Sequence, residues 1–239
     1  MSRSRLALRA GCLGLTALAI AAAAAACGSE TSSSPAVLLD ASGVDGSTTD
    51  SGSPDAVVDT PDATVVADIT SDFSLAANPN GAWTYGYIPD GPAIGSGDAG
   101  ALIVFSAVNG GLSWYDPSNV VLGAPAVFRN DTDASVVFTE PGEFAMHPGN
   151  AHEYVVSRWI APAAGTYAIS IQFKAGDQGE TNGLLLHNGI AILTEDSTST
   201  NAVHDVTVNL AAGDALDVAV GSKGGFDYDT TPVHLTIRK

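Results

Sequence analysis

Hydrophobic residues recur along residues 68–239 in short runs that Gly, Pro, Asn and Asp separate. Runs of this kind, rich in Val, Ile, Phe, Tyr and Thr, predict β-strands. The predicted strands are Trp83–Ile88, Leu102–Val108, Val136–Thr139, Tyr154–Ile160, Thr166–Phe173, Leu184–His187, Val203–Leu210, Leu216–Val220 and His234–Arg238. No window here has the 3.6-residue apolar period of an amphipathic helix.

Several of these runs alternate with period two. In residues 166–173, Tyr167, Ile169, Ile171 and Phe173 alternate with small or polar residues, which is typical of half-buried antiparallel strands. The pair Asn188-Gly189 between two apolar runs is a strong hairpin signal. The pattern therefore predicts an all-β domain: a two-sheet antiparallel sandwich with jelly-roll topology.

The N-terminal segment has a different pattern. Three arginines in the first nine residues precede an apolar run, Ala10–Ala26, which ends at Cys27. This order indicates a signal peptide over residues 1–26, and it resembles a lipobox, which implies lipidation of Cys27. Ala24 stands where lipoboxes usually carry Leu. Cleavage by ordinary signal peptidase, giving a secreted soluble protein, and a retained membrane anchor are the alternatives.

Residues 27–67 contain mainly Ser, Thr, Asp, Pro, Ala and Val, with no basic or aromatic residue. Such a segment has little to bury and carries one sign of charge, so we expect a disordered linker. The expected organisation is therefore a signal peptide, an acidic linker and a β-sandwich over residues 68–239. Cys12 lies in the signal peptide, so the sandwich must fold without a disulfide.

Charge limits the possible partners. The chain has 26 acidic and nine basic residues, and three of the basic ones lie in the signal peptide. The strong negative charge of the remainder would repel nucleic acid and anionic lipid headgroups. A neutral polysaccharide, a cationic surface or another protein remains as a partner.

Five blocks of sequence occur in a fixed order: Asp72–Leu75, Asn78–Tyr87, His147–Gly149, Arg158–Tyr167 and Ala211–Gly221. This series resembles a β-sandwich domain of exported bacterial proteins, including proteins with PEP-CTERM sorting tails. The resemblance covers about Asp72 to Ile237 and implies a jelly roll like that of carbohydrate-binding modules. It implies no particular activity and no binding residues.

Motifs of catalysis are absent from the sequence. There is no Gly-x-Ser-x-Gly, His-Glu-x-x-His or phosphate-binding Gly-x-x-x-x-Gly-Lys, and the five histidines lack metal-ligand spacing. Glu140 and Glu143 are a conceivable acid and base pair for glycoside hydrolysis. The Pro141-Gly142 turn between them favours a solvated loop instead. We therefore expect a protein that is not an enzyme.

Aromatic residues are the best candidates for ligand contact, since a flat ring can pack on the apolar C–H face of a sugar. Trp114 and Tyr115 follow Gly110-Gly111 in a loop-like setting, where burial is a weaker explanation. Trp83 and Tyr85 alternate on a predicted strand and would line one face, which is either a binding face or core.

Carboxylates in two loops suggest calcium, which takes oxygen ligands. Asp227 and Asp229 follow Gly224-Gly225, and Asp177 lies in another loop near Glu180. The alternative is that Asp is simply a favoured turn residue. No cofactor other than calcium is predicted.

The leading hypothesis is a surface lipoprotein whose non-catalytic head binds carbohydrate or extracellular matrix. Membrane contact would be through the lipid alone. A structural or protein-interaction module of the cell envelope is the second hypothesis, and a hydrolase the third. Gly28 rather than Asp follows Cys27, which by analogy with lipoprotein sorting favours the outer membrane, at the cell surface or its periplasmic face.

Overall fold

The computed structural model describes residues 63–89, 94–97, 101–119 and 123–239. The predicted signal peptide, Cys27 and most of the predicted linker lie outside the described residues. The strands are β1 (Val65–Asp68), β2 (Trp83–Ile88), β3 (Ile103–Val104), β4 (Ala107–Asn109), β5 (Ser113–Tyr115), β6 (Ala126–Arg129), β7 (Phe144–His147), β8 (Tyr154–Ile160), β9 (Gly165–Phe173), β10 (Thr181–His187), β11 (Ile190–Glu195), β12 (Val203–Leu210), β13 (Ala215–Ser222) and β14 (Thr231–Arg238). Within these ranges the only helix is a 3-10 turn at Thr198–Thr200.

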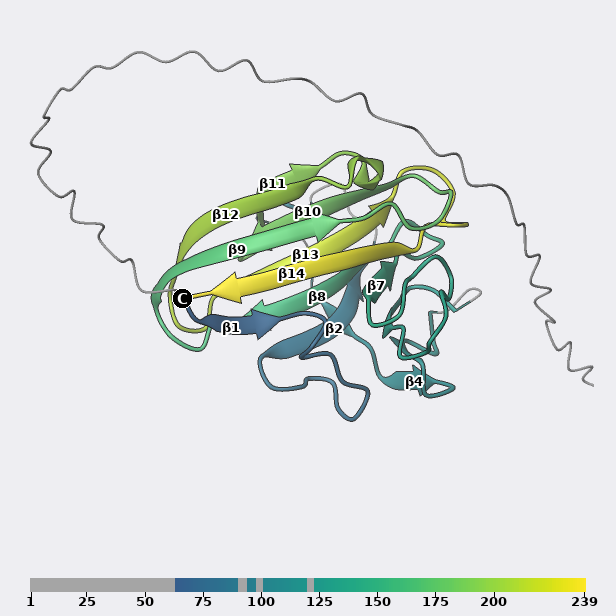
Figure 1. Cartoon of the computed structure of the whole chain (residues 1–239), viewed down its shortest axis with the longest axis horizontal. Helices are drawn as coiled ribbons and strands as arrows, with labels where there is room; N and C mark the ends of the chain where they lie inside the picture. Colours follow the sequence, from purple (N-terminus) through teal and green to yellow (C-terminus); the bar gives the residue numbers. More distant parts are fainter. Residues whose placement is uncertain (1–62, 90–93, 98–100, 120–122) are drawn as a thin grey trace, which may run out of the picture. The chain divides into compact units, whose positions relative to one another are not determined.

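The strands form two antiparallel sheets (Figure 1). Sheet A has the order β12-β9-β14-β7-β6-β5-β4, and β1 also pairs with β14. Sheet B has the order β11-β10-β13-β8-β2-β3. The two halves of β14 have different neighbours on the same side: Thr231 and Pro232 pair with β7, whereas Thr236 to Arg238 pair with β1.

From β7 to β10, and again from β12 to β14, each strand lies in the opposite sheet from the one before it. The predicted sandwich with jelly-roll topology is therefore confirmed. The connection at residues 211–214 illustrates the pattern, because it carries the chain from β12 in sheet A to β13 in sheet B. Gly213 there has φ +90°, a conformation that favours glycine.

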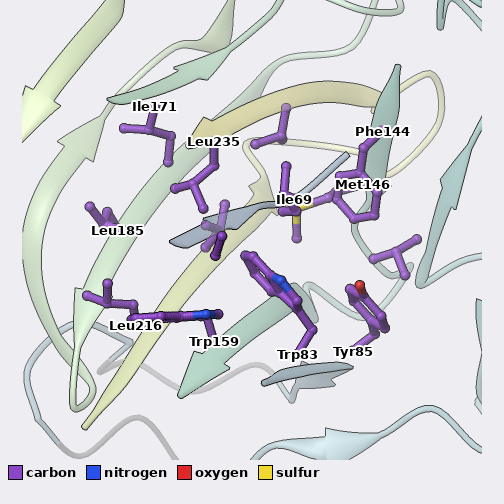
Figure 2. Packing of buried hydrophobic residues seen from close by; sticks show 14 of the residues in the cluster. Ile69, Trp83, Tyr85, Phe144, Met146, Trp159, Ile171, Leu185, Leu216 and Leu235 are labelled. Carbon is purple, nitrogen blue, oxygen red and sulfur yellow. The ribbon is translucent and has the colours of Figure 1, made fainter. Parts of the chain in front are cut away.

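The core lies between the two sheets. Figure 2 shows Ile171 and Leu235 of sheet A with Trp83, Trp159 and Leu185 of sheet B in one apolar cluster. The alternation predicted for β9 is confirmed, since its four apolar side chains are at most 1% exposed. No disulfide is needed, because the strands bury a continuous apolar layer.

A second apolar cluster covers the outer face of sheet B. Its buried members are Ile88, Val156, Leu184, Leu186 and Ala219, against which Ile94, Leu102, Tyr154 and Ala191 pack. The middle strands of sheet B are therefore buried on both faces, which explains why β10 reads as a continuous apolar run rather than an alternating one.

Four expectations for the strands were wrong. The predicted strand Leu102–Val108 is divided into two strands, β3 in sheet B and β4 in sheet A. Residues 136–139, predicted as a strand, form a tight turn whose ends make a single bridge. Trp114 and Tyr115, assigned to a loop, lie in β5. β1 begins at Val65, so the first strand starts inside the segment assigned to the linker and ends at Asp68, just beyond it. The Asn188-Gly189 hairpin between β10 and β11 is confirmed.

A search of the described residues for a helix long and apolar enough to cross a membrane finds none.

Candidate functional site

A groove of about 390 Å³ opens on the outer face of the β4–β7 part of sheet A. Strand alternation explains its position. In β6, Val127 points into the core, whereas Ala126 and Phe128 line the groove. In β7, Met146 is a core residue and His147 lines the groove. The same strands therefore supply one wall of the core and the floor of the groove.

One wall of the groove is the loop between β6 and β7. Asn130, only 3% exposed, fixes its base. The side-chain amide of Asn130 donates hydrogen bonds to the carbonyl oxygens of Ala134 and Thr139, both at 2.8 Å. Its side-chain oxygen accepts hydrogen bonds from the backbone N–H and hydroxyl of Thr132. This bonding gives the loop a defined shape with few apolar contacts of its own.

The tip of this loop is strained. Val136 and Thr139 exchange two backbone hydrogen bonds of 2.9 and 3.0 Å. Between them Val137 and Phe138 have φ values of +47° and +58°, the geometry of a type I′ turn, which normally contains Asn-Gly. A β-branched residue rarely adopts this conformation, which costs on the order of 1–3 kcal/mol per residue.

The strained turn also holds apolar side chains in solvent. Val137 is 53% exposed and Phe138 52% exposed, and Val136 and Val137 line the groove. Leu112 in the β4–β5 turn also lines the groove and is 67% exposed. A turn that is strained and exposes apolar groups beside a groove is expected at a binding site rather than in a purely structural connection.

Polar groups stand among the apolar ones. Arg129 Nε lies 2.5 Å from Asp131 Oδ1, and a second guanidinium nitrogen donates to Asp131 Oδ2 at 3.2 Å. The same guanidinium donates to the carbonyl of Thr70 at 3.0 Å, which fixes its orientation. Asn109 and Thr132 also line the groove. The groove thus combines an apolar floor with an oriented ion pair and neutral hydrogen-bonding groups, the usual make-up of a small-ligand site.

His147, in β7, is one of the residues that line the groove. Burial lowers its pKa, although the carbonyl of Pro148 and the negative charges of Asp177 and Asp227 act in the opposite direction. Its Nδ1 is 2.8 Å from the Pro148 oxygen. His147 therefore places the groove next to the acidic loops in which the sequence predicted calcium ligands.

The predicted aromatic platform is not formed. Trp83 is 2%, Tyr85 0% and Trp114 7% exposed, and all three belong to the core. Trp114 Nε1 donates to the Ser74 carbonyl at 2.8 Å, and Trp83 Nε1 to Asp72 at 3.1 Å, so the indole nitrogens of both tryptophans have partners within the fold. Tyr115 is half-buried in β5. For Trp83 and Tyr85 the alternative of a core position holds. For Trp114 the structure corrects the expectation of ligand contact.

The two loops that carry the predicted calcium ligands lie side by side. The β9–β10 loop, with Asp177, is joined to the β13–β14 loop, with Asp227 and Asp229, through a hydrogen bond of 2.7 Å from Gly179 N to Tyr228 O. The sequence placed them in separate loops, and the two-sheet topology brings the loops side by side. Asp229 is 1% exposed, and within the described residues neither of its carboxylate oxygens has a hydrogen-bond partner.

Glu140 and Glu143 do not form an acid and base pair. The backbone N–H of Glu140 donates to Glu143 Oε2 at 2.9 Å, while Lys174 and His234 contact Oε1. Burial raises the pKa of Glu143, but these hydrogen bonds outweigh it, and the pKa is lowered overall. A carboxylate with this environment stays ionised and is suited to structure rather than to proton donation.

Sequence analysis missed the residues of the groove. Val136, Val137 and Phe138 have high β propensity, and nothing local shows that they form a turn at positive φ. Leu112 carried a usable signal, because an apolar residue directly after Gly110-Gly111 at a hairpin tip has little chance of burial. Asn130-Asp131 was a second signal, since both residues favour turns.

Comparison with protein-family models gives no match, and no curated protein is similar to the chain in sequence. Similar solved structures exist. A family 35 carbohydrate-binding module from an environmental isolate is 21% identical, with a TM-score of 0.30, over 40% of this chain and 72% of that one. A family 35 module from Clostridium thermocellum is 14% identical, with a TM-score of 0.26, over 56% and 85%.

A CBM51 structure from Clostridium perfringens, in complex with methyl-galactose, is 11% identical to this chain, with a TM-score of 0.30, over 49% of this chain and 81% of that one. At such identities and TM-scores, likeness says nothing about what this chain binds. The two sheets define the class of this protein as a two-sheet antiparallel β-sandwich.

Proposed function

We propose that this β-sandwich is a non-catalytic carbohydrate-binding domain and that the groove over β4–β7 is its glycan site. The observation that carries the proposal is the combination of a mostly apolar groove with a strained turn that keeps Val137 and Phe138 exposed. Without a ligand, these groups only add strain and apolar surface. With a ligand, both the strain and the exposure are explained, because the turn would hold Val137 and Phe138 where they contact the ligand instead of the core.

The chemistry of the groove suits a neutral sugar. Apolar C–H faces of a pyranose can pack on Phe128, Leu112 and Val137, while its hydroxyls can bond to Asn109, Thr132 and the Arg129–Asp131 pair. The groove volume, about 390 Å³, lies in the lower part of the range for small-ligand sites, roughly 300–1,000 Å³. This volume favours one or two sugar units at a time. The negative charge of the chain disfavours acidic polysaccharides.

The test is binding of the purified full-length protein to a panel of neutral and acidic polysaccharides by affinity electrophoresis and calorimetry. Two substitutions address the groove: Leu112→Ala removes an exposed apolar contact, and Val137→Asn replaces a strained residue with one that tolerates positive φ. We expect each to weaken binding about 5- to 20-fold. Because Val137→Asn relieves strain, its loss of affinity could not be attributed to unfolding.

Val203→Ala is the matched control, since Val203 is an apolar residue of β12 that is 61% exposed and lies outside the groove. It should bind as the wild type does. Absence of binding across the panel would refute the glycan proposal and favour the envelope-interaction module, whose partner would be a protein. Saturable binding unaffected by both groove substitutions would place the site elsewhere.

Export and lipid anchoring are the remaining part of the proposal, and they rest on the sequence around Cys27. A lipidated protein would partition into detergent and incorporate labelled palmitate, and Cys27→Ser would abolish both. If the protein were instead cleaved after Ala26 without lipidation, it would be found in the soluble exported fraction. With the lipid on Cys27, the anchor would hold the sandwich at a bacterial membrane, favouring the outer one, through lipid contact alone.

A further inference from the structure

The loops β9–β10 and β13–β14 are joined by three backbone hydrogen bonds. Gly179 N donates to Tyr228 O at 2.7 Å, Asp177 N to Thr230 O at 3.2 Å, and Lys223 N to Glu180 O at 2.9 Å. The approach is close: a Cβ on Gly179 would lie 1.9 Å from Asp229 Oδ1. A side chain at that position would collide with the carboxylate, so the glycine allows the two loops to meet at Asp229.

Asp229 is the unusual residue of this junction. Its side chain is 1% exposed, and neither carboxylate oxygen has a hydrogen-bond partner among the described residues. The hydroxyl of the next residue, Thr230, is also buried without a partner. A buried ionised carboxylate with no partner costs several kcal/mol, so a native structure rarely contains one unless a further group completes it.

The charges around Asp229 add to this cost. Its pKa is raised to about 7, mainly by burial and in smaller part by the negative charges of Asp177 and Asp227. Asp177 and Asp227 thus lie near enough to act on the charge of Asp229, whose two oxygens have no hydrogen-bond partner among the described residues, and a cation is a group that would neutralise this carboxylate.

We propose that Asp229, together with Asp177 and Asp227, binds a calcium ion that fastens the β9–β10 loop to the β13–β14 loop. The donors are carboxylate oxygens, as calcium requires, and the nearest histidine, His147, is turned with Nδ1 toward Pro148 O. A histidine-rich or cysteine-rich site would have favoured zinc.

Side chains alone do not complete the site. No group of three or more His, Cys, Asp or Glu residues in the described part of the chain is placed so that it could hold a metal ion, so the three carboxylates would have to move toward the ion as it binds. Calcium takes six to eight oxygens and accepts backbone carbonyls and water among them. The loop backbone and solvent supply the remainder, so the ion would order both loops as it binds. This inference stands apart from the glycan proposal, because the ion is detected with no sugar present.

The test is calcium titration of the metal-free full-length protein by calorimetry, with terbium luminescence as a second readout, since the ring of Tyr228 lies between two of the ligands in sequence. We expect one calcium per chain and a higher unfolding temperature in calcium. Asp229→Asn should weaken binding at least about 100-fold. Asp227 is exposed, so Asp227→Asn will not disturb the fold, and it should weaken binding about 10-fold.

Asp205→Asn is the control, because it also removes one carboxylate but from the exposed face of β12, and calcium binding should not change. The proposal is overturned if calcium neither binds nor shifts the unfolding temperature. It is also overturned if Asp229→Asn and Asp205→Asn bind calcium equally well. If calcium does not bind, a proton would neutralise Asp229 instead. Asp229→Asn would then be more stable than the wild type above pH 7, with or without calcium.

Discussion

Arg158 and Asp217 face each other across the β8–β13 pairing, and two hydrogen bonds of 2.7 Å join the guanidinium to both carboxylate oxygens. The Asp217 side chain is 1% exposed, whereas that of Arg158 is 29% exposed. Hydrogen bonding to Asp217 is the largest cause of the raised pKa of Arg158. Loss of the ion pair should therefore cost more at the carboxylate than at the guanidinium, because the guanidinium can still reach water.

Removing Arg158 should therefore be more harmful than removing Asp217. Arg158→Met leaves a buried carboxylate unpaired, and we expect the free energy of unfolding to fall by about 3 kcal/mol. Asp217→Leu leaves a partly exposed guanidinium and should cost about 1–2 kcal/mol. The double variant should recover most of the loss, since two apolar side chains can replace a buried pair. Urea denaturation followed by tryptophan fluorescence measures all three.

The comparison needs an exposed ion pair as its reference. Asp131 is 61% exposed beside Arg129, so Asp131→Asn should change the free energy of unfolding by less than about 1 kcal/mol. If Arg158→Met and Asp217→Leu lowered the free energy of unfolding equally, the buried carboxylate would not depend on its partner more than the guanidinium does.

At the Val137-Phe138 turn we expect a substitution that stabilises the folded protein. Replacing both residues with Asn-Gly, the preferred pair for a type I′ turn, should raise the free energy of unfolding by about 1–2 kcal/mol. Thermal and urea unfolding would show the gain. The reverse substitution, in which Val-Phe replaces Asn188-Gly189 in the β10–β11 turn, should lower the free energy of unfolding. If the Asn-Gly turn at 137–138 has no effect on stability, the strain that supports the binding proposal is absent.

Sequence pattern was most informative where one periodicity dominates. β2, β8 and β12 begin and end where the sequence predicted, because each alternates or is rich in β-branched and aromatic residues between clear turn signals. β5, β6 and β7 were missed, since each has only three or four residues. Segments this short acquire their conformation from the neighbouring strands rather than from their own propensity.

The candidate site was harder to predict than the fold for a related reason. Trp114 looks exposed in sequence because two glycines precede it, yet β5 turns its ring into the core. Whether a ring is platform or core depends on which face of a strand it occupies, and a shift of one residue reverses that. Asp177 was correctly grouped as an acidic loop residue, but its nearness to Asp229 depends on how the two sheets are connected.

The burial of Trp114 changes what its substitution can reveal. Trp114→Ala should lower the free energy of unfolding by about 3–5 kcal/mol, through lost packing and the unpaired carbonyl of Ser74. Any loss of binding would then reflect unfolding. Trp114→Phe should keep most of the stability and all of the glycan affinity. A variant that stays folded, as judged by circular dichroism, but loses only affinity would restore Trp114 as a contact residue.

Asp229 makes stability depend on pH with an unusual sign. Its pKa is raised to about 7 in the folded protein from 3.8, so between these values the folded state keeps a proton that the unfolded state has released. The free energy of unfolding should therefore fall as pH rises from about 4 to about 7, by about 1.4 kcal/mol per pH unit. The neighbouring Asp177 and Asp227 strengthen this effect by repulsion.

His147 acts in the opposite direction, because burial lowers its pKa below 6.5 and the unfolded state binds the proton more readily. Comparison of the wild type with Asp229→Asn removes this contribution to first order, since both contain His147. In metal-free buffer the difference between the two should change steadily from pH 4 to pH 7, in favour of the variant. In excess calcium the ionised carboxylate is the bound form, so above pH 7 the wild type should become the more stable protein. If the difference in free energy of unfolding between the two proteins changed with neither pH nor calcium, the carboxylate of Asp229 would be hydrated rather than buried.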